Sequence, residues 1–289
     1  MKRRTFLSSS GALIACLPHL VSDSRAQPPQ MTLLSAPLEL GGDWQSSPPN
    51  DVLAVISRMR EVCLSGVRLL SDRQPAKLRV DNHSSGLPHI WLHKEESDIA
   101  WIVVDIGALD WCKLAYQLGH ELGHVMCNSW QWQAISKLPS RWLEEALVEA
   151  FSIRGLGLLA DSWERRPPFP HDAAFADAIR KYRQDLIEKY RKPARKPPAL
   201  NMCAWLRENR DTLDHTPGVG TVEGPEILQI AAEMERDRAA VEDLGALNRW
   251  PARTEVPIED YLRLWRASCA EIRAPGLLPA KLAQSLCLS

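Results

Sequence analysis

The stretch Gly119-His-Glu-Leu-Gly-His124 lies in a segment whose pattern predicts a helix from Asp110, as the cap, to about Asn128. Its two histidines are four residues apart, just over one helical turn, so both imidazoles project from one face and can share one metal ion. Glu121 points about 100° away from His120, where its carboxylate can act on a water molecule without binding the metal. Chance alone would produce this His-Glu-x-x-His pattern roughly 0.01 times per chain. The stretch therefore predicts a metal-dependent hydrolytic centre with Glu121 as the general base.

A second helix, predicted from Pro139-Ser140 to about Leu159, offers a third ligand. Glu145 and Glu149 lie four residues apart on one stripe of this helix. Like charges at this spacing repel each other, so a partly buried pair needs a counter-charge. We assign Glu145 as the third ligand and Glu149 as the acceptor of the outer N–H of a ligand histidine, which fixes the tautomer of that ring. Glu144 is expected to be solvated, and a one-residue shift that makes Glu144 the ligand stays open.

The two segments together resemble the gluzincin metallopeptidases, which include thermolysin-like and aminopeptidase N-like enzymes. His120-Glu121-x-x-His124 is followed, after 20 intervening residues, by Glu145 within Trp142-Leu-Glu-Glu-Ala146, and another acidic residue lies one turn further on. The resemblance covers about residues 99–155. It implies one Zn²⁺ ion held by His120, His124 and Glu145, and hydrolysis of a peptide or protein substrate by a metal-activated water with Glu121 as the general base. It also implies that the strand 101–105 borders the substrate cleft.

Gluzincins take a tyrosine or histidine from further along the chain to stabilise the oxyanion, and no local motif marks that residue in this sequence. The candidates are Tyr182, Tyr190, His171 and His215. Metzincins, another class of zinc peptidases, need a glycine three residues and a histidine six residues after the second motif histidine, but these positions hold Cys127 and Trp130. Cys127 lies about 10 Å along the helix axis from His120, too far to bind the same ion, and is expected to be buried or disulfide-bonded.

Two other functions stay open at this point. The first is a zinc hydrolase that cuts cell-wall peptide amides, because the motif determines the attacking water and not the substrate. The second is a non-catalytic binding protein with a zincin-like fold, since the oxyanion donor is not identified. A purely structural zinc would need a fourth protein ligand, and a histidine from residues 166–289 is the candidate. The sequence does not distinguish endo- from exopeptidase action.

The rest of the chain predicts an α+β fold that is predominantly helical and zincin-like. An extended lead-in over residues 27–50 precedes a helix at 51–70 and short β segments at 77–80, 89–93 and 99–106. After the two metal-binding helices, the apolar pattern predicts helices at 173–191, 201–209, 225–244, 258–272 and 279–286. The chain is therefore expected to divide into a mixed α/β subdomain, residues 27–165, and an all-helical subdomain, residues 166–289.

Residues 1–26 resemble a twin-arginine signal peptide, with Arg3-Arg4 ahead of a short apolar run and small residues before Gln27. The mature protein is accordingly expected in the periplasm or outside the cell. Leu13-Ile-Ala-Cys16 also resembles a lipobox, so a lipid anchor at Cys16 is an alternative. No later stretch has the roughly 18 apolar residues that a transmembrane span requires.

An oxidising compartment would allow the six later cysteines to form disulfides, in any of 15 pairings when all six are used. The balance of 35 basic and 36 acidic side chains gives a net charge of −1. Basic residues therefore do not outnumber acidic ones, and nucleic acid is not expected as a partner.

Overall fold

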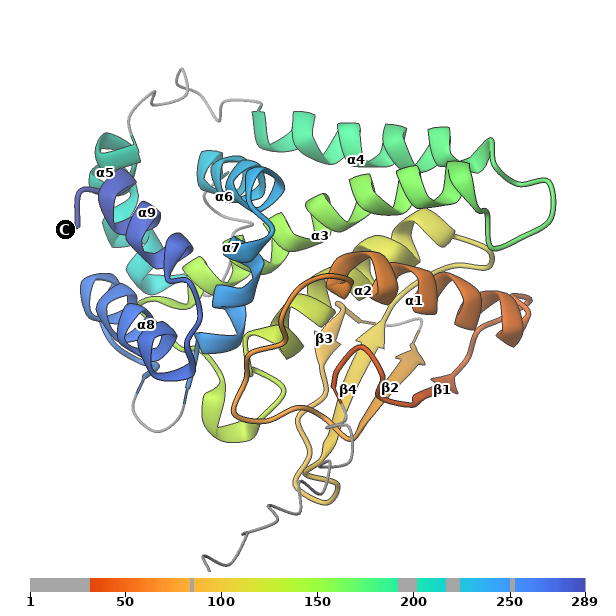
Figure 1. Cartoon of the computed structure of the whole chain (residues 1–289), viewed down its shortest axis with the longest axis horizontal. Coiled ribbons are helices and arrows are strands. Elements are labelled where there is room, and N and C mark those ends of the chain that lie inside the picture. The colour runs from red at the N-terminus through yellow and green to blue at the C-terminus, as the bar shows by residue number, and fades with distance from the viewer. Residues whose placement is uncertain (1–31, 84–85, 192–201, 217–223, 250–252, 289) are drawn as a thin grey trace, which may run out of the picture. The chain divides into compact units, whose positions relative to one another are not determined.

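Figure 1 shows the computed structural model of the chain, which describes residues 32–83, 86–191, 202–216, 224–249 and 253–288. Residues 31–289 form one compact unit. Its small sheet and its predominance of helices confirm the expected α+β class. The predicted signal peptide and Cys16 lie outside the described residues. Among the helices that are described, none has both the length and the apolar character needed to cross a bilayer.

The sheet has four strands in the order β1-β2-β4-β3. These are β1 (Leu38–Gly42), β2 (Lys77–Asn82), β3 (His89–Ile90) and β4 (Ile99–Val104). β1, β2 and β4 run parallel, whereas β3 is antiparallel to β4 and forms one edge. β2 and β4 bury alternate apolar side chains, as strands with one face on the core do. β1 lies within the predicted lead-in, which is therefore partly a strand.

Three helices connect this sheet to the rest of the unit (Figure 1). They are α1 (Pro49–Leu64), α2 (Trp111–Met126) and α3 (Arg141–Arg165). α1 and α2 pack on the strands and on α3, and α4 (Phe175–Arg191) runs alongside α3. Asp110 accepts a hydrogen bond from the backbone of Lys113 and caps α2, as the sequence predicts. α3 extends to Arg165, beyond the predicted end near Leu159, and its long apolar face joins the sheet side to the helical side in one core.

The helical half contains α5 (Met202–His215), α6 (Pro225–Arg236), α7 (Ala239–Glu242), the 3-10 helix η2 (Asp243–Ala246), α8 (Ile258–Ile272) and α9 (Leu277–Ser285). The predicted helix at 225–244 is wrong as a single element, because α6 ends at Arg236. Asp237 takes an extended conformation, with φ −135° and ψ 109°, and its side chain accepts from the backbone of Ala239. A local side-chain acceptor of this kind competes with helix continuation.

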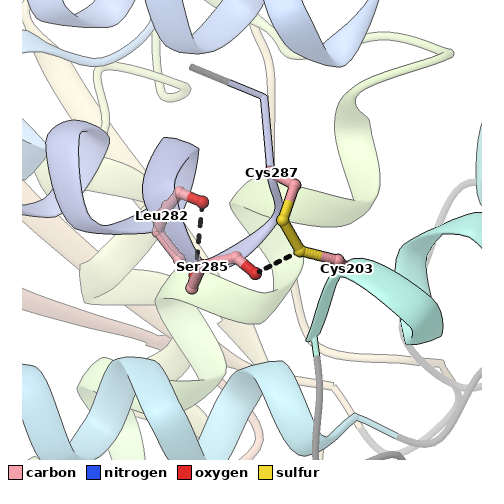
Figure 2. Close-up of a disulfide and its surroundings, with 4 residues drawn as sticks. All are labelled: Cys203, Leu282, Ser285 and Cys287. Carbon is pink, nitrogen blue, oxygen red and sulfur yellow. Dashed lines mark hydrogen bonds between the residues drawn. A yellow bond between two sulfur atoms is a disulfide. The ribbon is translucent and has the colours of Figure 1, made fainter.

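One disulfide joins Cys203, near the start of α5, to Cys287, just after α9 (Figure 2). The carbonyl oxygen of Ser285 lies 3.6 Å from the Cys203 sulfur, so the last turn of α9 packs against this link. The other described cysteines, Cys63, Cys112, Cys127 and Cys269, are thiols. The described structure therefore has a single disulfide, which ties the end of the chain to α5, and matches none of the 15 pairings that use all six cysteines.

α2 and α3 cross at two glycines of the motif helix. A Cβ added to Gly123 would lie 2.8 Å from Cβ and 3.1 Å from Cα of Val148, and one added to Gly119 would lie 2.9 Å from Oγ of Ser152. Real Cβ atoms essentially never lie closer than 3.0 Å to another heavy atom, so a larger residue at either glycine would require the facing residue of α3 to shift. The cost of glycine inside a helix, about 1 kcal/mol relative to alanine, is offset by this close approach. The crossing brings the face of α3 that carries Glu145 next to the two motif histidines.

Replacing Gly123 by alanine is expected to lower the free energy of unfolding by about 1–3 kcal/mol, because the new methyl group overlaps Val148 and its backbone. Chemical denaturation monitored by circular dichroism measures the change. Gly157→Ala, on α3, is the matched control: its added Cβ would meet only the flexible Arg183 side chain, at 3.2 Å. There the gain in helix propensity, up to about 1 kcal/mol, is expected to equal or exceed the cost. Equal effects of the two changes would contradict the close crossing.

Candidate metal centre

Three side chains converge where α2 faces α3. His120 Nε2 and His124 Nε2 lie 3.5 and 3.6 Å from the same oxygen, Oε2 of Glu145. One potential ligand atom from each residue lies within 4.8 Å of the other two. Three atoms placed about 2.0 Å from a tetrahedral zinc would be about 3.3 Å apart, so the two nitrogen–oxygen distances are close to those that the ion requires. The structure therefore brings together the three residues that the sequence predicts as ligands.

Each motif histidine has a carboxylate at its other ring nitrogen. Nδ1 of His120 lies 3.0 Å from Oε2 of Glu149, and Nδ1 of His124 lies 2.6 Å from Oε1 of Glu144. A hydrogen bond donated by Nδ1 leaves Nε2 with its lone pair, which is the tautomer that a metal needs. Both rings are therefore oriented with the ligand nitrogen toward Glu145.

Glu149 lies where the sequence predicts, and it is held by more than His120. Only 2% of its surface is exposed. The hydroxyl of Tyr116 donates to both carboxylate oxygens at 2.9 Å, and that of Tyr190 donates to Oε1 at 2.9 Å. A buried carboxylate is costly unless its oxygens are hydrogen-bonded, and these donors meet that need. They hold the acceptor of His120 in one position.

Glu144 was expected to be solvated, and that expectation is wrong. Its exposed fraction is 0%, and its second oxygen accepts a hydrogen bond from Asn248, which lies 104 residues later in the chain. Glu144 contacts the outer nitrogen of His124, whereas Glu145 faces Nε2 of both histidines. The one-residue shift that would make Glu144 the ligand therefore does not match this arrangement. Helical periodicity gave no signal for the role of Glu144, because its partner comes from a distant segment.

The pKa values describe a site that attracts cations. Burial by itself lowers the pKa of His120, but hydrogen bonds to Glu145 and Glu149 outweigh it and raise that pKa to about 9. Against the same effect of burial, the bonds of His124 to Glu144 and Glu145 raise its pKa well above 6.5. Burial raises the pKa of Glu145, but its bonds to the two histidines outweigh this and hold it below 4.5. Protons on the imidazoles thus balance the carboxylates, and a divalent cation would displace those protons.

A cleft of about 360 Å³ opens over these residues. One wall is apolar and comes largely from the segment that contains β3; the opposite side carries polar side chains from α2, from α3 and from the loop between them. The lining residues are Leu87, Pro88, His89, Ile90, Leu92, His120, Glu121, His124, Ser129, Ile135, Ser136, Arg141, Glu144 and Glu145. The strand at the cleft is therefore β3. The expectation for residues 101–105 is wrong, because β4 is interior, with β2 on one side and β3 on the other.

Glu121 lines the cleft and is not part of the three-residue cluster. It is 2% exposed, and no hydrogen bond to its Oε2 comes from the residues that the structure describes. Burial is the largest influence on this carboxyl group and raises its pKa above 4.5. A raised pKa makes a carboxylate a stronger base, so the site combines a possible cation site with an unengaged base.

None of the four residues predicted as oxyanion donors lines the cleft. Tyr190 donates its hydroxyl proton to Glu149, and Tyr182 packs against the ring of Tyr116. His171 is exposed beyond the far end of α3, and His215 is exposed at the end of α5. The prediction used residue type and chain order alone, which do not determine position in space. The structure therefore places none of these four candidates at the cleft.

Among the lining side chains, Arg141 is the strongest donor outside the cluster. It lies one turn before Glu145 on α3, and its Nε and one terminal nitrogen are each 3.4 Å from Oε1 of Glu145. His89 is different: its Nδ1 lies 2.8 Å from the Leu87 carbonyl oxygen, so the neutral ring donates there and keeps only an acceptor at Nε2. The i,i+4 spacing of Arg141 and Glu145 was a signal that the sequence analysis did not use.

No protein-family model, no curated protein and no solved structure matches the chain. The class of site therefore follows from its geometry alone. It is a possible metal-binding site, made by two imidazoles and one carboxylate from two crossed helices.

Proposed function

We propose that this chain is a zinc-dependent metallopeptidase of the gluzincin type. The observation that carries the proposal is the convergence of His120 Nε2 and His124 Nε2 on one oxygen of Glu145, beside a buried carboxylate, Glu121, that shares their cleft. Two imidazoles and one carboxylate leave a tetrahedral ion one open position, as hydrolytic zinc sites require. When bound, zinc supplies Lewis acidity, which polarises a carbonyl group and makes water more acidic.

The side chains of the site would carry out the proton transfer and would orient the metal ligands. Glu121 accepts a proton from the attacking water and transfers it to the departing amine nitrogen, so no group of the protein is consumed. Glu144 and Glu149 keep the two histidines in the ligand tautomer. No covalent intermediate with the protein forms in this sequence of events.

The position of β3 favours a peptide substrate. It is one of the two edge strands of the described sheet and its residues line the cleft, so an extended peptide can pair with its backbone. Leu87, Ile90 and Leu92 give this wall an apolar surface that a substrate side chain can contact. A cell-wall peptide contains the same kind of amide bond, so the experiment below also includes cell-wall peptides as substrates.

The experiment that tests the proposal is digestion of a mixed peptide library by the purified protein with zinc, with chelator, and after zinc is restored. Cleavage that chelator removes and zinc restores is the expected result, and a parallel digestion of purified cell-wall peptides separates the two substrates. A protein that holds zinc stoichiometrically but cleaves neither substrate would contradict the proposal and would favour a binding protein.

Arg141→Gln is expected to lower kcat about 100-fold while KM changes little. Its guanidinium lines the cleft beside Glu145, where it donates to the substrate carbonyl oxygen as that oxygen gains negative charge. Steady-state kinetics at saturating zinc, with the metal content measured in parallel, checks this. Arg165→Gln, at the other end of α3, is the matched control and should behave like the wild type. An unchanged kcat for Arg141→Gln would exclude Arg141 as the donor.

A further inference from the structure

A chain of buried polar side chains runs from His124 into the helical half of the protein. Oε1 of Glu144 contacts Nδ1 of His124, and Oε2 accepts a hydrogen bond of 2.5 Å from Nδ2 of Asn248. Oδ1 of Asn248 in turn accepts a hydrogen bond from the hydroxyl of Tyr261, on α8. Glu144, Asn248 and Tyr261 are 0%, 2% and 1% exposed. The acceptor of one candidate metal ligand is therefore held from a segment more than 100 residues away.

The amide of Asn248 is fully used, and its orientation is thereby determined. Nδ2 donates to Glu144 and also to Oγ of Ser129 at 2.9 Å, while Oδ1 receives the proton of Tyr261. If the amide were rotated by half a turn, its oxygen would face the Glu144 carboxylate and its NH₂ group would face the tyrosine. Because a carboxylate only accepts whereas a tyrosine hydroxyl can donate or accept, Glu144 determines that Nδ2 of Asn248 faces it, and Tyr261 supplies the donor to Oδ1 in that orientation.

The backbone that carries Asn248 is also tied to the motif helix. Asn128, four residues after His124, donates from its side chain to the carbonyl oxygens of Gly245 and Leu247, at 3.1 and 2.7 Å. Asn248 itself has φ +51°, in the left-handed region that asparagine tolerates better than most residues. These bonds place the Asn248 side chain against α2 and α3 at once.

The cost of burying Glu144 explains why this arrangement matters. A buried carboxylate that loses a hydrogen-bond donor is destabilised in its position. Among the described residues, the donors to its two oxygens are His124 and Asn248. Removing Asn248 would leave Oε2 without a donor, and Glu144 would no longer hold Nδ1 of His124 in place.

We propose that Asn248 and Tyr261 are positioning residues for the metal centre: they hold Glu144 so that His124 presents Nε2 to the cation. This inference rests on the proposed function, because it needs a metal at His120, His124 and Glu145. It makes the helical half a structural requirement of the site even though none of its residues is a ligand.

The test measures zinc affinity by competition with a chromophoric chelator. Asn248→Ala is expected to weaken zinc binding about 10- to 100-fold, the usual loss when an outer partner of a ligand histidine is removed. Tyr261→Phe should weaken it less, since Asn248 keeps its bond to Glu144 and loses only the donor to its Oδ1. Asn209→Ala is the matched control, because Asn209 donates only to the Trp205 carbonyl within α5. The Co²⁺ absorption spectrum of each variant reports whether the ligand geometry changes.

Two further measurements separate positioning from general support of the fold. Thermal melts of the metal-free variants identify any variant that fails to fold. If Asn248→Ala fails to fold, Tyr261→Phe, which removes only one hydroxyl group, tests the proposal in its place. In a Glu144→Ala background, Asn248→Ala should cause no additional loss of zinc affinity, because it acts through Glu144.

The results distinguish this inference from the proposed function. Wild-type zinc affinity and Co²⁺ spectrum in folded Asn248→Ala and Tyr261→Phe would overturn the inference while leaving peptide hydrolysis intact. A wild-type protein that binds zinc but cleaves nothing would overturn the proposed function, and the affinity differences would still stand. A wild-type protein that binds no divalent metal would overturn both.

Discussion

Glu121→Gln is expected to abolish peptide hydrolysis, with kcat reduced about 1,000-fold or more, while the metal stays bound. The change is almost isosteric and removes only the ability to accept a proton, a role that contributes about 100- to 10,000-fold in general base catalysis. Glu121 lines the cleft and is 2% exposed, but it does not belong to the cluster of three ligand atoms. Its loss should therefore leave the ligands unchanged.

Turnover and zinc content of the same preparation check this prediction together. Glu61→Gln, an exposed change on α1, is the control and should retain both. Full activity of Glu121→Gln would refute its role as the base. Loss of zinc along with activity would show that Glu121 supports the metal site rather than the proton transfer.

Glu145→Ala is expected to weaken zinc binding about 1,000-fold, because removing one of the three protein ligands removes a comparable share of the binding free energy of a zinc site. The neighbouring change Glu144→Ala should weaken it only about 10- to 100-fold, since Glu144 contacts the outer nitrogen of His124. Two adjacent residues of the same type thus test the register of α3 directly.

Zinc affinity by chelator competition measures the difference between these variants. Wild-type stability of the metal-free proteins, checked by thermal melts, would show that each change acts on the site. The reverse order, with the larger loss in Glu144→Ala, would show that Glu144 and not Glu145 is the ligand.

The sequence was most informative where a single helix carries the pattern. The spacing of His120 and His124 and the cap at Asp110 are local features, and α2 extends over nearly the predicted range. The helix predicted at 258–272 also coincides with α8. Both segments combine a regular apolar stripe with clear ends, so local physics is sufficient there.

The sequence was least informative where a residue is defined by a distant partner. Nothing near Glu144 indicates that it is buried, because Asn248 and Tyr261 come from the other end of the chain. β1 was missed for a related reason: it ends in Gly41-Gly42, which are weak strand formers, and only pairing with β2 makes it a strand. The four oxyanion candidates lie away from the cleft, because residue type carries no information about which surface a side chain faces.

α2 and α3 approach each other closely at Gly119 and Gly123, away from the cleft wall formed by the β3 segment. The proposed metal coordination and the proposed substrate selectivity can therefore be altered independently by mutation. The proposed coordination would depend on a pair of helices whose spacing is set by their own main chains. The proposed substrate selectivity would depend on the cleft-lining residues of the strand segment, Leu87, Pro88, His89, Ile90 and Leu92, which lie outside that contact. Under the proposed function, mutations in this segment would therefore change which peptide is cut without disturbing the metal ligands, whereas the two glycines have little freedom to vary.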